Sequence, residues 1–199
     1  MDNHQNLKCY EGVESVQLRL PEKEFDAYMQ DKLRSADSDL EFIKQRVFEK
    51  RGKLDVCEIG SGNSKLLYRL EADDVIKNKA VGYEVAESRY RLAEKFKSAL
   101  QSKLVDNRHQ NFLDAPPEEQ YDLIIMVDIV LQMIASLDAE AEAQAMDWLY
   151  QSIYRGGIFS SNWKTSRPFC TKSTWTGAES IGSGMNFHRP IPTLMGCIA

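Results

Sequence analysis

The first fifty residues of the chain carry apolar side chains at helical intervals. Phe25, Tyr28, Met29 and Leu33 fall on one face of a helix, so this pattern predicts a helix over residues 22–34. Polar and charged residues occupy most positions between them, as expected for a helix that packs one face on a larger domain.

A second helix is expected to begin at Ser38. The serine hydroxyl can cap the first turn, and Glu41 completes the capping-box pattern. Gly52 follows the apolar stripe, and glycine commonly ends a helix. The two helices together predict a helical N-terminal cap over residues 1–52, ahead of the main domain.

From residue 53 onward, short apolar runs alternate with amphipathic segments. The predicted strands span residues 54–59, 80–84, 109–113, 121–127 and 158–160. One predicted helix contains Leu66 and Leu70, and two more span residues 87–104 and 138–154, where Gly156 and Gly157 would stop the last. Strands that alternate with helices form a doubly wound, mainly parallel sheet, so the fold class is α/β. Ligands of such sheets bind at the carboxyl ends of the strands.

Composition and charge narrow the classes of function. The 199 residues are 43% hydrophobic and 28% charged, which is typical of a globular protein rather than a fibre or a disordered tail. The net charge is −5 and no basic block stands out, so no nucleic acid partner is expected. The cysteines and histidines lack the spacing of a metal site.

The chain also lacks sequence signals for secretion or membrane insertion. Its N-terminus has no apolar stretch of the kind found in signal peptides. The most apolar segment, residues 123–134, contains Asp128 and Gln132 and is too short to span a bilayer. We therefore expect a cytoplasmic protein that has reduced cysteines and no membrane partner.

The strongest chemical signal lies at the end of the first predicted strand. Gly60 and Gly62 let the chain turn sharply there and let a ligand approach the backbone closely. The helix that follows offers unpaired N–H groups and the positive end of its dipole. Glu84 ends the second predicted strand, and its carboxylate can accept hydrogen bonds from both hydroxyls of a ribose. These features predict a site for a ligand that contains a nucleoside.

The pattern favours one class of nucleoside cofactor. A dinucleotide fingerprint requires a third glycine where this chain has Lys65, which argues against a nicotinamide or flavin cofactor. Instead, residues 53–163 resemble the class I, Rossmann-like methyltransferases that depend on S-adenosylmethionine (SAM). The matching segments, in order, are residues 58–63, 82–84, 111–114, 121–128 and 156–159.

The resemblance implies a role for each residue at the methionine end of SAM. Gly60, Ser61 and Gly62 would wrap the methionine part of the cofactor, and Asn63 would also bind the cofactor. Glu58 would hold this loop or bind the amino group of the ligand.

The resemblance assigns the adenosine end to later segments. Glu84 would bind the ribose hydroxyls, and Val85 would pack on the adenine ring. Asn111 stands where many relatives have an aspartate, and its amide oxygen would accept a hydrogen bond from the adenine amino group. Phe112 would offer its backbone N–H to the ring.

The acceptor side of the site is implied by position within the family pattern. Asp128, at the end of the fourth predicted strand, would face the methionine end of SAM and the substrate, and it is one candidate base. His188 is a second candidate base. Tyr28, Asn162 and Trp163 would contact the acceptor, for which a small hydroxylated molecule such as a sugar or a natural product is expected.

The end of the chain departs from the family pattern. Residues 164–199 are rich in Ser, Thr, Gly and Pro, and no two convincing strands are found within residues 177–199. This segment is interpreted as a divergent or truncated end of the same domain. It would leave the edge of the fifth strand exposed, which would favour self-association.

Each feature also has a purely structural interpretation. A Gly-x-Gly sequence after a strand is a common turn, Glu58 and Glu84 could be solvated acids, and Asn111 and Asp114 could be turn formers. An inactive SAM-binding domain that works through a partner and a nicotinamide-dependent reductase remain as alternatives to a methyltransferase.

Overall fold

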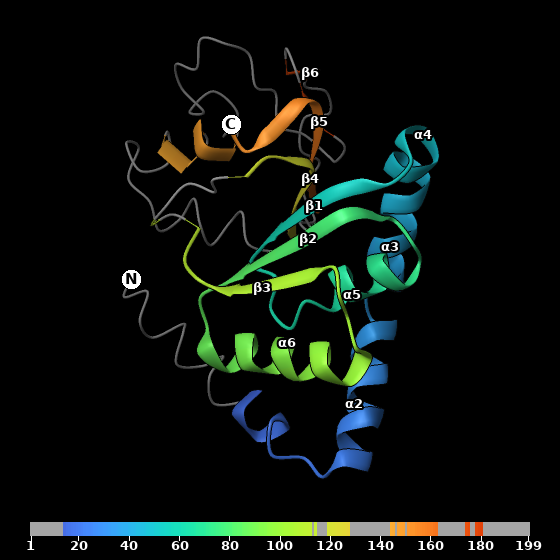
Figure 1. Ribbon diagram of the computed structural model, residues 1–199, viewed down its shortest axis with the longest axis vertical. Helices are drawn as coiled ribbons and strands as arrows, with labels where there is room; N and C mark the ends of the chain where they lie inside the picture. The colour runs from blue at the N-terminus through green and yellow to red at the C-terminus, as the bar shows by residue number, and fades with distance from the viewer. Residues whose placement is uncertain are drawn as a thin grey trace, which may run out of the picture.

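The computed structural model describes residues 14–112, 114, 119–127, 144–145, 147–149, 151–162, 174–175 and 178–180, with only the backbone described from residue 154 onward. In this part of the chain, seven strands form one sheet in the order β3-β2-β1-β4-β5-β7-β6 (Figure 1). The strands are β1 (Leu54–Ile59), β2 (Ile76–Glu84), β3 (Val105–His109), β4 (Tyr121–Val127), β5 (Ile153–Asn162), β6 (Thr174–Trp175) and β7 (Ala178–Ser180).

Neighbouring strands are parallel throughout except for β6 and β7. The strand order reverses between β1 and β4, which are hydrogen-bonded neighbours. The predicted doubly wound, mainly parallel α/β sheet is therefore confirmed. Ligands of such sheets bind where the order reverses, so a ligand site is expected at the carboxyl ends of β1, β2 and β4.

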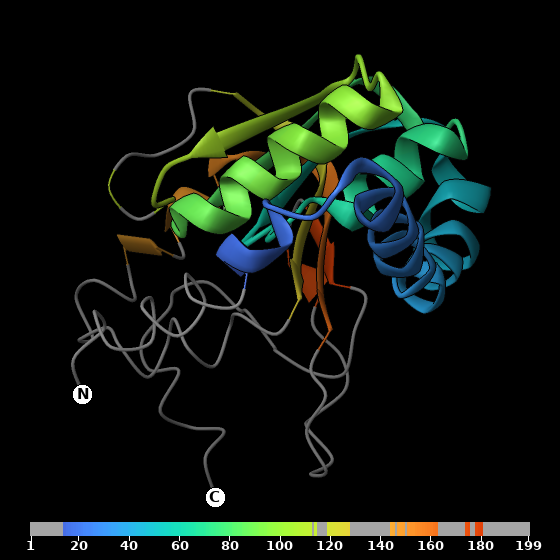
Figure 2. The same ribbon diagram turned by 90° about the horizontal axis from the view of Figure 1, so that it is seen from below.

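Helices from the first half of the chain cover one face of this sheet. They are α2 (Glu22–Arg34), α3 (Asp37–Ile43), the π-helical turn η1 (Lys44–Phe48), α4 (Glu49–Arg51), α5 (Lys65–Ala72) and α6 (Glu87–Leu100). Helix α2 lies beside α6 (Figures 1 and 2). Of its predicted apolar stripe, Phe25, Met29 and Leu33 are buried and Tyr28 is partly buried. Phe25 meets Phe96 of α6 edge to face, with the ring centroids 5.6 Å apart. Buried side chains of α2, α3, α5, α6 and the sheet belong to one hydrophobic cluster.

Polar contacts also fasten the N-terminal helices to the rest of the domain. Lys44 pairs with Asp73 at 2.7 Å, and Arg69 pairs with Asp37 at 3.0 Å. The Lys95 ammonium lies 3.7 Å from the centroid of the Phe25 ring, a cation–π contact. These bonds join α3 and the following turn to α5 and its end, and α2 to α6.

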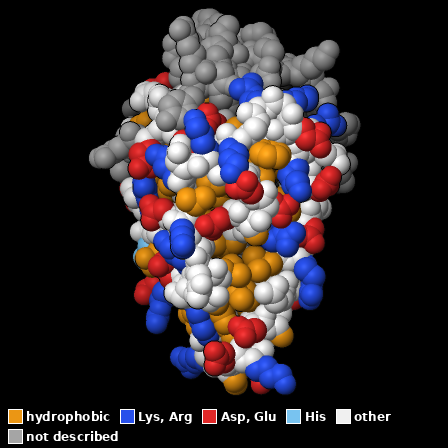
Figure 3. All heavy atoms as spheres, turned by 45° about the vertical axis from the view of Figure 1, so that its right-hand side comes forward, with side chains coloured by type: hydrophobic (Ala, Val, Ile, Leu, Met, Phe, Trp, Pro, Cys, Tyr) orange, Lys and Arg blue, Asp and Glu red, His pale blue; other side chains and the backbone are white. Residues whose placement is uncertain are grey.

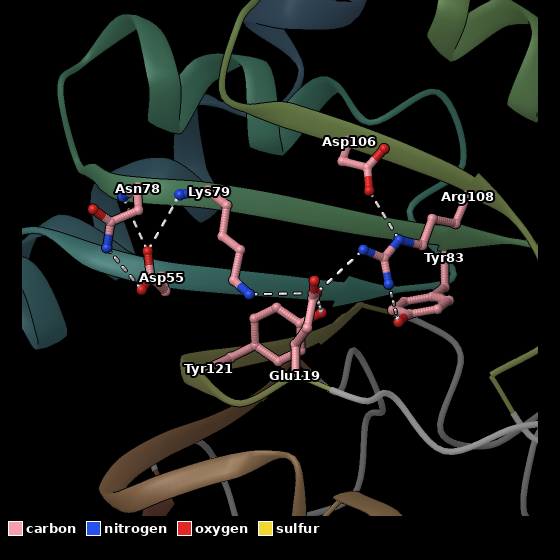
Figure 4. A network of polar contacts seen from close by, with 8 residues as sticks. All are labelled: Asp55, Asn78, Lys79, Tyr83, Asp106, Arg108, Glu119 and Tyr121. Carbon is pink, nitrogen blue, oxygen red and sulfur yellow. Dashed lines mark hydrogen bonds and ion pairs between the residues drawn. The ribbon is translucent and has the colours of Figure 1, made fainter.

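The opposite face of the sheet carries a network of charged side chains (Figure 4). Arg108 of β3 binds Asp106 at 2.9 Å and Glu119 at 3.2 Å, and it donates to the Tyr83 hydroxyl at 3.0 Å. Although burial acts to raise the pKa of Glu119, the Tyr121 hydroxyl and the nearby cations hold it below its usual range. Glu119 is thus a well-partnered anion that links β2, β3 and β4.

Charges of both signs are interspersed on the described part of the face shown in Figure 3. That face therefore presents no patch of one sign of the kind that attracts a phosphate backbone. Among the described helices, none is long and apolar enough to cross a membrane.

Several predicted boundaries in the sheet were wrong. The third strand was expected at residues 109–113 but is Val105–His109, and its buried positions are Val105 and Asn107. The sequence did not reveal β3 because this edge strand has one apolar residue, Val105, and its remaining residues are polar or charged. Gly156 and Gly157 lie inside β5 and do not stop a helix, so the helix predicted to reach residue 154 ends before Ile153.

Two further expectations at the ends of elements were also wrong. Ser38 does not cap a helix, because α3 begins at Asp37 after Ala36, which makes no side-chain capping bond. The edge of β5 was also expected to be exposed, but one strand within residues 177–199, β7, pairs with Gly157, Ile158 and Phe159 of β5. Part of the β5 edge expected to be exposed is therefore covered. Strands of two or three residues are too short to produce a periodic pattern in the sequence.

Phe96 is the aromatic centre of the packing between α2, α5 and α6, since it contacts the rings of Phe25, Tyr28 and Tyr68. Phe96→Ala should lower the free energy of unfolding by about 3–5 kcal/mol, because it leaves a cavity at a fully buried position. Urea denaturation measures this loss. Phe42→Ala is the matched control, since Phe42 is 39% exposed and should cost about 1 kcal/mol or less. Equal losses for the two variants would contradict the assignment.

Candidate functional site

The loop after β1 is shaped by three residues with positive φ. Gly60 and Gly62 have φ of 70° and 58°, a region that glycine enters without steric cost. Ser64, just before α5, has φ 56° and is left-handed although it is not glycine. The backbone N–H groups of Gly60 and Ser61 donate to the Tyr83 carbonyl at 2.8 and 3.0 Å. The loop therefore folds back onto the end of β2.

Buried side chains hold Ser64 in this conformation. Its hydroxyl donates to Asn107 Oδ1 at 2.7 Å and lies 3.3 Å from Ser61 Oγ. The Asn107 amide in turn donates to the Tyr68 hydroxyl at 2.8 Å and to Glu94 at 2.7 Å. A left-handed non-glycine residue costs on the order of 1 kcal/mol, and these hydrogen bonds offset that strain.

Gly82 in β2 provides the space that the loop needs. A Cβ at this position would lie 2.7 Å from Ser61 Oγ and 3.0 Å from Ser64 Oγ, which is closer than side chains tolerate. The strand therefore has a glycine where the loop packs on it. The sequence pattern alone does not reveal this role of Gly82.

Glu84 lies beside this loop, because it ends β2 and the carboxyl ends of the parallel strands β1 and β2 lie at the same edge of the sheet. Its Oε2 accepts a hydrogen bond from the Gly62 N–H at 2.8 Å, and its Oε1 accepts one from the Ala86 N–H at 2.8 Å. The residue is 6% exposed. Each carboxylate oxygen has a second lone pair, so Glu84 can accept further hydrogen bonds from ligand hydroxyls.

Val85 follows Glu84 and presents an apolar side chain that is 44% exposed. The neighbouring backbone is fixed from β3, where His109 Nε2 lies 3.1 Å from the Val85 carbonyl oxygen. The imidazole also stacks on Tyr90 of α6, with ring centroids 5.3 Å apart. An exposed apolar surface next to a carboxylate suits a ligand that has a flat ring joined to a sugar.

Glu58 lies in β1 just before the loop and is 6% exposed. Its Oε2 is buried and has no hydrogen-bond partner among the described residues. Burial raises its pKa to about 8; Lys65 opposes this shift, whereas Asp39 and Glu84 add to it. The environment thus favours a protonated carboxyl group at neutral pH.

Tyr28 of α2 reaches the same loop from the N-terminal helices. Its hydroxyl interacts with the side chain of Asn63, and its ring meets Phe96 with centroids 6.2 Å apart. Burial, followed by the charge of Glu14, raises the pKa of Tyr28 to about 12. The phenol is therefore neutral at ordinary pH and can donate a hydrogen bond.

Asn111 and Phe112 lie in a turn after β3. The Asn111 amide donates to Asp114 Oδ1 at 3.0 Å, and the Asp114 N–H donates to the Asn111 carbonyl at 3.1 Å. Phe112 is buried and meets Tyr83 edge to face, with centroids 5.7 Å apart. This turn matches the structural interpretation raised for Asn111 and Asp114, and the ring of Phe112 fixes it to β2.

Comparisons with known proteins address the fold. No protein-family model matches the chain, and no curated protein matches it either. The structure of a DhpI–SAH complex matches with 18% identity and a TM-score of 0.51, over 77% of this chain and 64% of DhpI. A SAM-dependent methyltransferase from Thiobacillus denitrificans, in complex with S-adenosyl-L-homocysteine, matches with 23% identity and a TM-score of 0.44, over 54% of this chain and 40% of its own.

The chain has the fold of the class I SAM-dependent methyltransferases. It matches less than two thirds of the length of either solved protein. The methyltransferase fold accounts for the sheet order and for the position of the loop at its centre.

The structure does not describe every residue singled out in the sequence. Asp128, Trp163 and His188 lie outside the described residues. Asn162 is the last residue of β5 and pairs with Val127 of β4, although its side chain is not described. Its backbone is thus at the same edge of the methyltransferase fold as the glycine loop.

Three residues near the site were missed by sequence analysis, namely Ser64, Asn107 and His109. Ser64 stands before a helix, and Asn107 is a buried amide in a strand with alternating burial, so weak signals existed for both. His109 is the register partner of Glu84, which only strand pairing reveals. Within the described residues, no group of three or more His, Cys, Asp or Glu side chains could hold a metal ion.

The raised pKa of Glu58 makes stability depend on pH. Because the folded value of about 8 exceeds the usual 4.5, folding takes up a proton between these values. The wild-type protein should therefore lose stability as the pH rises from about 4.5 to 8, and Glu58→Gln should not share this loss. Urea unfolding at about pH 5 and 8 should show the variant gaining up to a few kcal/mol over wild type. A difference that is constant with pH would refute this.

Proposed function

We propose that the chain binds SAM at the carboxyl ends of β1 and β2 and transfers its methyl group to a small hydroxylated molecule such as a sugar or a natural product. The observation that carries this proposal is the bond between the Gly62 N–H and Glu84, with the exposed Val85 beside it. The SAH ligand of DhpI, which has the same fold at a TM-score of 0.51, supports the choice of cofactor.

The residues at this edge fit the parts of SAM in order. Glu84 has free lone pairs for the two ribose hydroxyls, and charge-assisted bonds of this kind contribute about 1.5–3 kcal/mol each. Val85 offers apolar surface to adenine. In this proposal the loop at Gly60–Gly62 lies along the methionine part, and Glu58 receives its ammonium group.

Asn111 and Phe112 are proposed for the rim of the adenine. Their turn follows β3, the strand that pairs with β2 up to Glu84. The amide oxygen of Asn111 would accept from the adenine amino group, and the Phe112 N–H would donate to the ring. The buried Phe112 ring supports this role because it keeps the turn in place.

Methyl transfer from a sulfonium demands little beyond alignment. The leaving thioether is neutral, so the protein must mainly hold the acceptor oxygen, methyl carbon and sulfur in line. Orientation of this kind can contribute several kcal/mol, with an upper range of about 7–11 kcal/mol. An oxygen nucleophile must also lose its proton to a base. Asp128, which follows the last residue of β4, is the proposed base, and His188 is the alternative.

Tyr28, Asn162 and Trp163 remain the proposed acceptor contacts. Tyr28 is the one whose side chain the structure describes, and its high pKa suits a hydrogen-bond donor rather than a base. Its contact with Asn63 supports this role, because Asn63 belongs to the loop proposed to bind SAM. It therefore suits an acceptor hydroxyl that approaches the methionine end of SAM.

Glu84→Gln tests the cofactor site. The variant keeps the shape of the side chain but loses its charge, so the Kd for S-adenosylhomocysteine should rise at least about tenfold. Titration calorimetry measures this change. Glu87→Gln is the control, since Glu87 is an exposed acid in the first turn of α6 and should bind as wild type does. An unchanged affinity for Glu84→Gln would exclude the ribose assignment.

A transfer assay tests the reaction itself. Labelled SAM is incubated with the protein and a panel of sugars, phenols and cell extract, and we expect label in at least one hydroxylated small molecule. Asp128→Asn should reduce that transfer by about 10²-fold or more while cofactor binding persists. Binding without transfer to any acceptor would favour the inactive SAM-binding alternative. Binding of NADH in place of SAM would favour a reductase.

A further inference from the structure

Glu58 is a buried acid, and in the described part of the chain one of its carboxyl oxygens has no hydrogen-bond partner. Its Oε2 is buried without a hydrogen-bond partner among the described residues, whereas both oxygens of Glu84 accept backbone N–H groups. An ionised oxygen in this position would carry a large desolvation cost. An unsatisfied buried group of this kind requires either a bound proton or a missing positive partner.

The charged groups that act on Glu58 come from three elements. Lys65 opens α5 and favours the ionised form, whereas Asp39 of α3 and Glu84 of β2 oppose it. Lys65 Nζ donates to Ser35 Oγ at 2.8 Å, so this cation is held by the turn between α2 and α3. Burial and the two carboxylates together raise the pKa of Glu58 more than Lys65 lowers it, so Glu58 keeps its proton when no ligand is bound.

We propose that Glu58 couples cofactor binding to proton release: it is protonated in the empty site, it loses that proton to solvent when the α-ammonium end of the cofactor arrives, and Lys65 sets the pH of this exchange. The inference rests on the proposed SAM site. One proton passes from the Glu58 carboxyl to solvent, and no other covalent bond changes. The incoming ammonium group supplies the donor that Oε2 lacks.

The sign of the pH dependence follows from linkage. A ligand that binds the ionised form of Glu58 more tightly lowers its pKa, so binding releases a proton and the affinity increases with pH. The increase approaches about tenfold per pH unit and ends near the pKa of the empty site. If Glu58 were already ionised in the empty protein, the affinity would not depend on pH through this group.

Titration calorimetry with S-adenosylhomocysteine tests the inference at about pH 6, 6.75 and 7.5, in buffers that differ in ionisation enthalpy. Wild type should release close to one proton per ligand at the lowest pH, and its Kd should fall by at least about fivefold over this range. Glu58→Gln should release none of this proton and bind with nearly constant affinity. Glu24→Gln, which alters an exposed acid of α2, should behave as wild type.

Lys65→Met provides a readout that a purely structural role of Glu58 would not move. Removing the cation should raise the pH at which the affinity levels off, so the variant should still release a proton at pH values where wild type has ceased to. Infrared difference spectra of ligand binding should also show the loss of a protonated carboxyl band, and Glu58→Gln should lack it.

The outcomes separate this inference from the proposed function. Binding by wild type without proton release, or equal release by Glu58→Gln, would overturn the role of Glu58 and leave the SAM site standing. Failure of wild type to bind S-adenosylhomocysteine at every pH would overturn both. Should Glu58→Gln unfold, the buffer dependence of the wild-type heat and the shift in Lys65→Met still decide.

Discussion

The hydrogen bond from the Gly62 N–H to the Glu84 carboxylate is the contact on which the candidate site depends. It joins the loop after β1 to the end of β2, and the second oxygen of Glu84 fixes the turn into α6 through Ala86. Because β1 and β2 are parallel neighbours, their carboxyl ends lie at the same edge of the sheet. One buried side chain thus sets the distance between a glycine-lined backbone and the start of a helix.

The N-terminal helices are coupled to this edge rather than simply placed beside it. The Tyr28 hydroxyl contacts Asn63, and Lys65 binds Ser35 in the turn between α2 and α3. Phe25 packs on Phe96 in the same cluster that supports the sheet. A displacement of α2 would therefore move the loop after β1 as well, so α2 and the proposed cofactor loop are mechanically linked.

The sequence predicts the local part of this arrangement well and the long-range part poorly. Gly60, Gly62 and Glu84 could be placed together because strand and helix alternation implies parallel neighbours with aligned ends. Nothing local predicts that Ser64 is held left-handed by Asn107, since that bond joins residues from separate elements. Ser38 shows the opposite failure: its capping pattern is sound, but α3 begins at Asp37, so Ala36 occupies the N-cap position and Ser38 lies inside the helix.

Glu58 and Glu119 differ in how fully the surrounding groups neutralise a carboxylate. Glu119 is bound by Arg108, Lys79 and the Tyr121 hydroxyl, which together hold its pKa low against the effect of burial, and its charge ties strands together. Glu58 has a buried oxygen with no such partner in the described structure, and burial raises its pKa. An acid whose charge is already neutralised has little to offer a ligand. An acid kept next to a backbone-lined loop without a donor can become an anion when a cation binds, which is why Glu58 rather than Glu119 is the acid expected to respond to one.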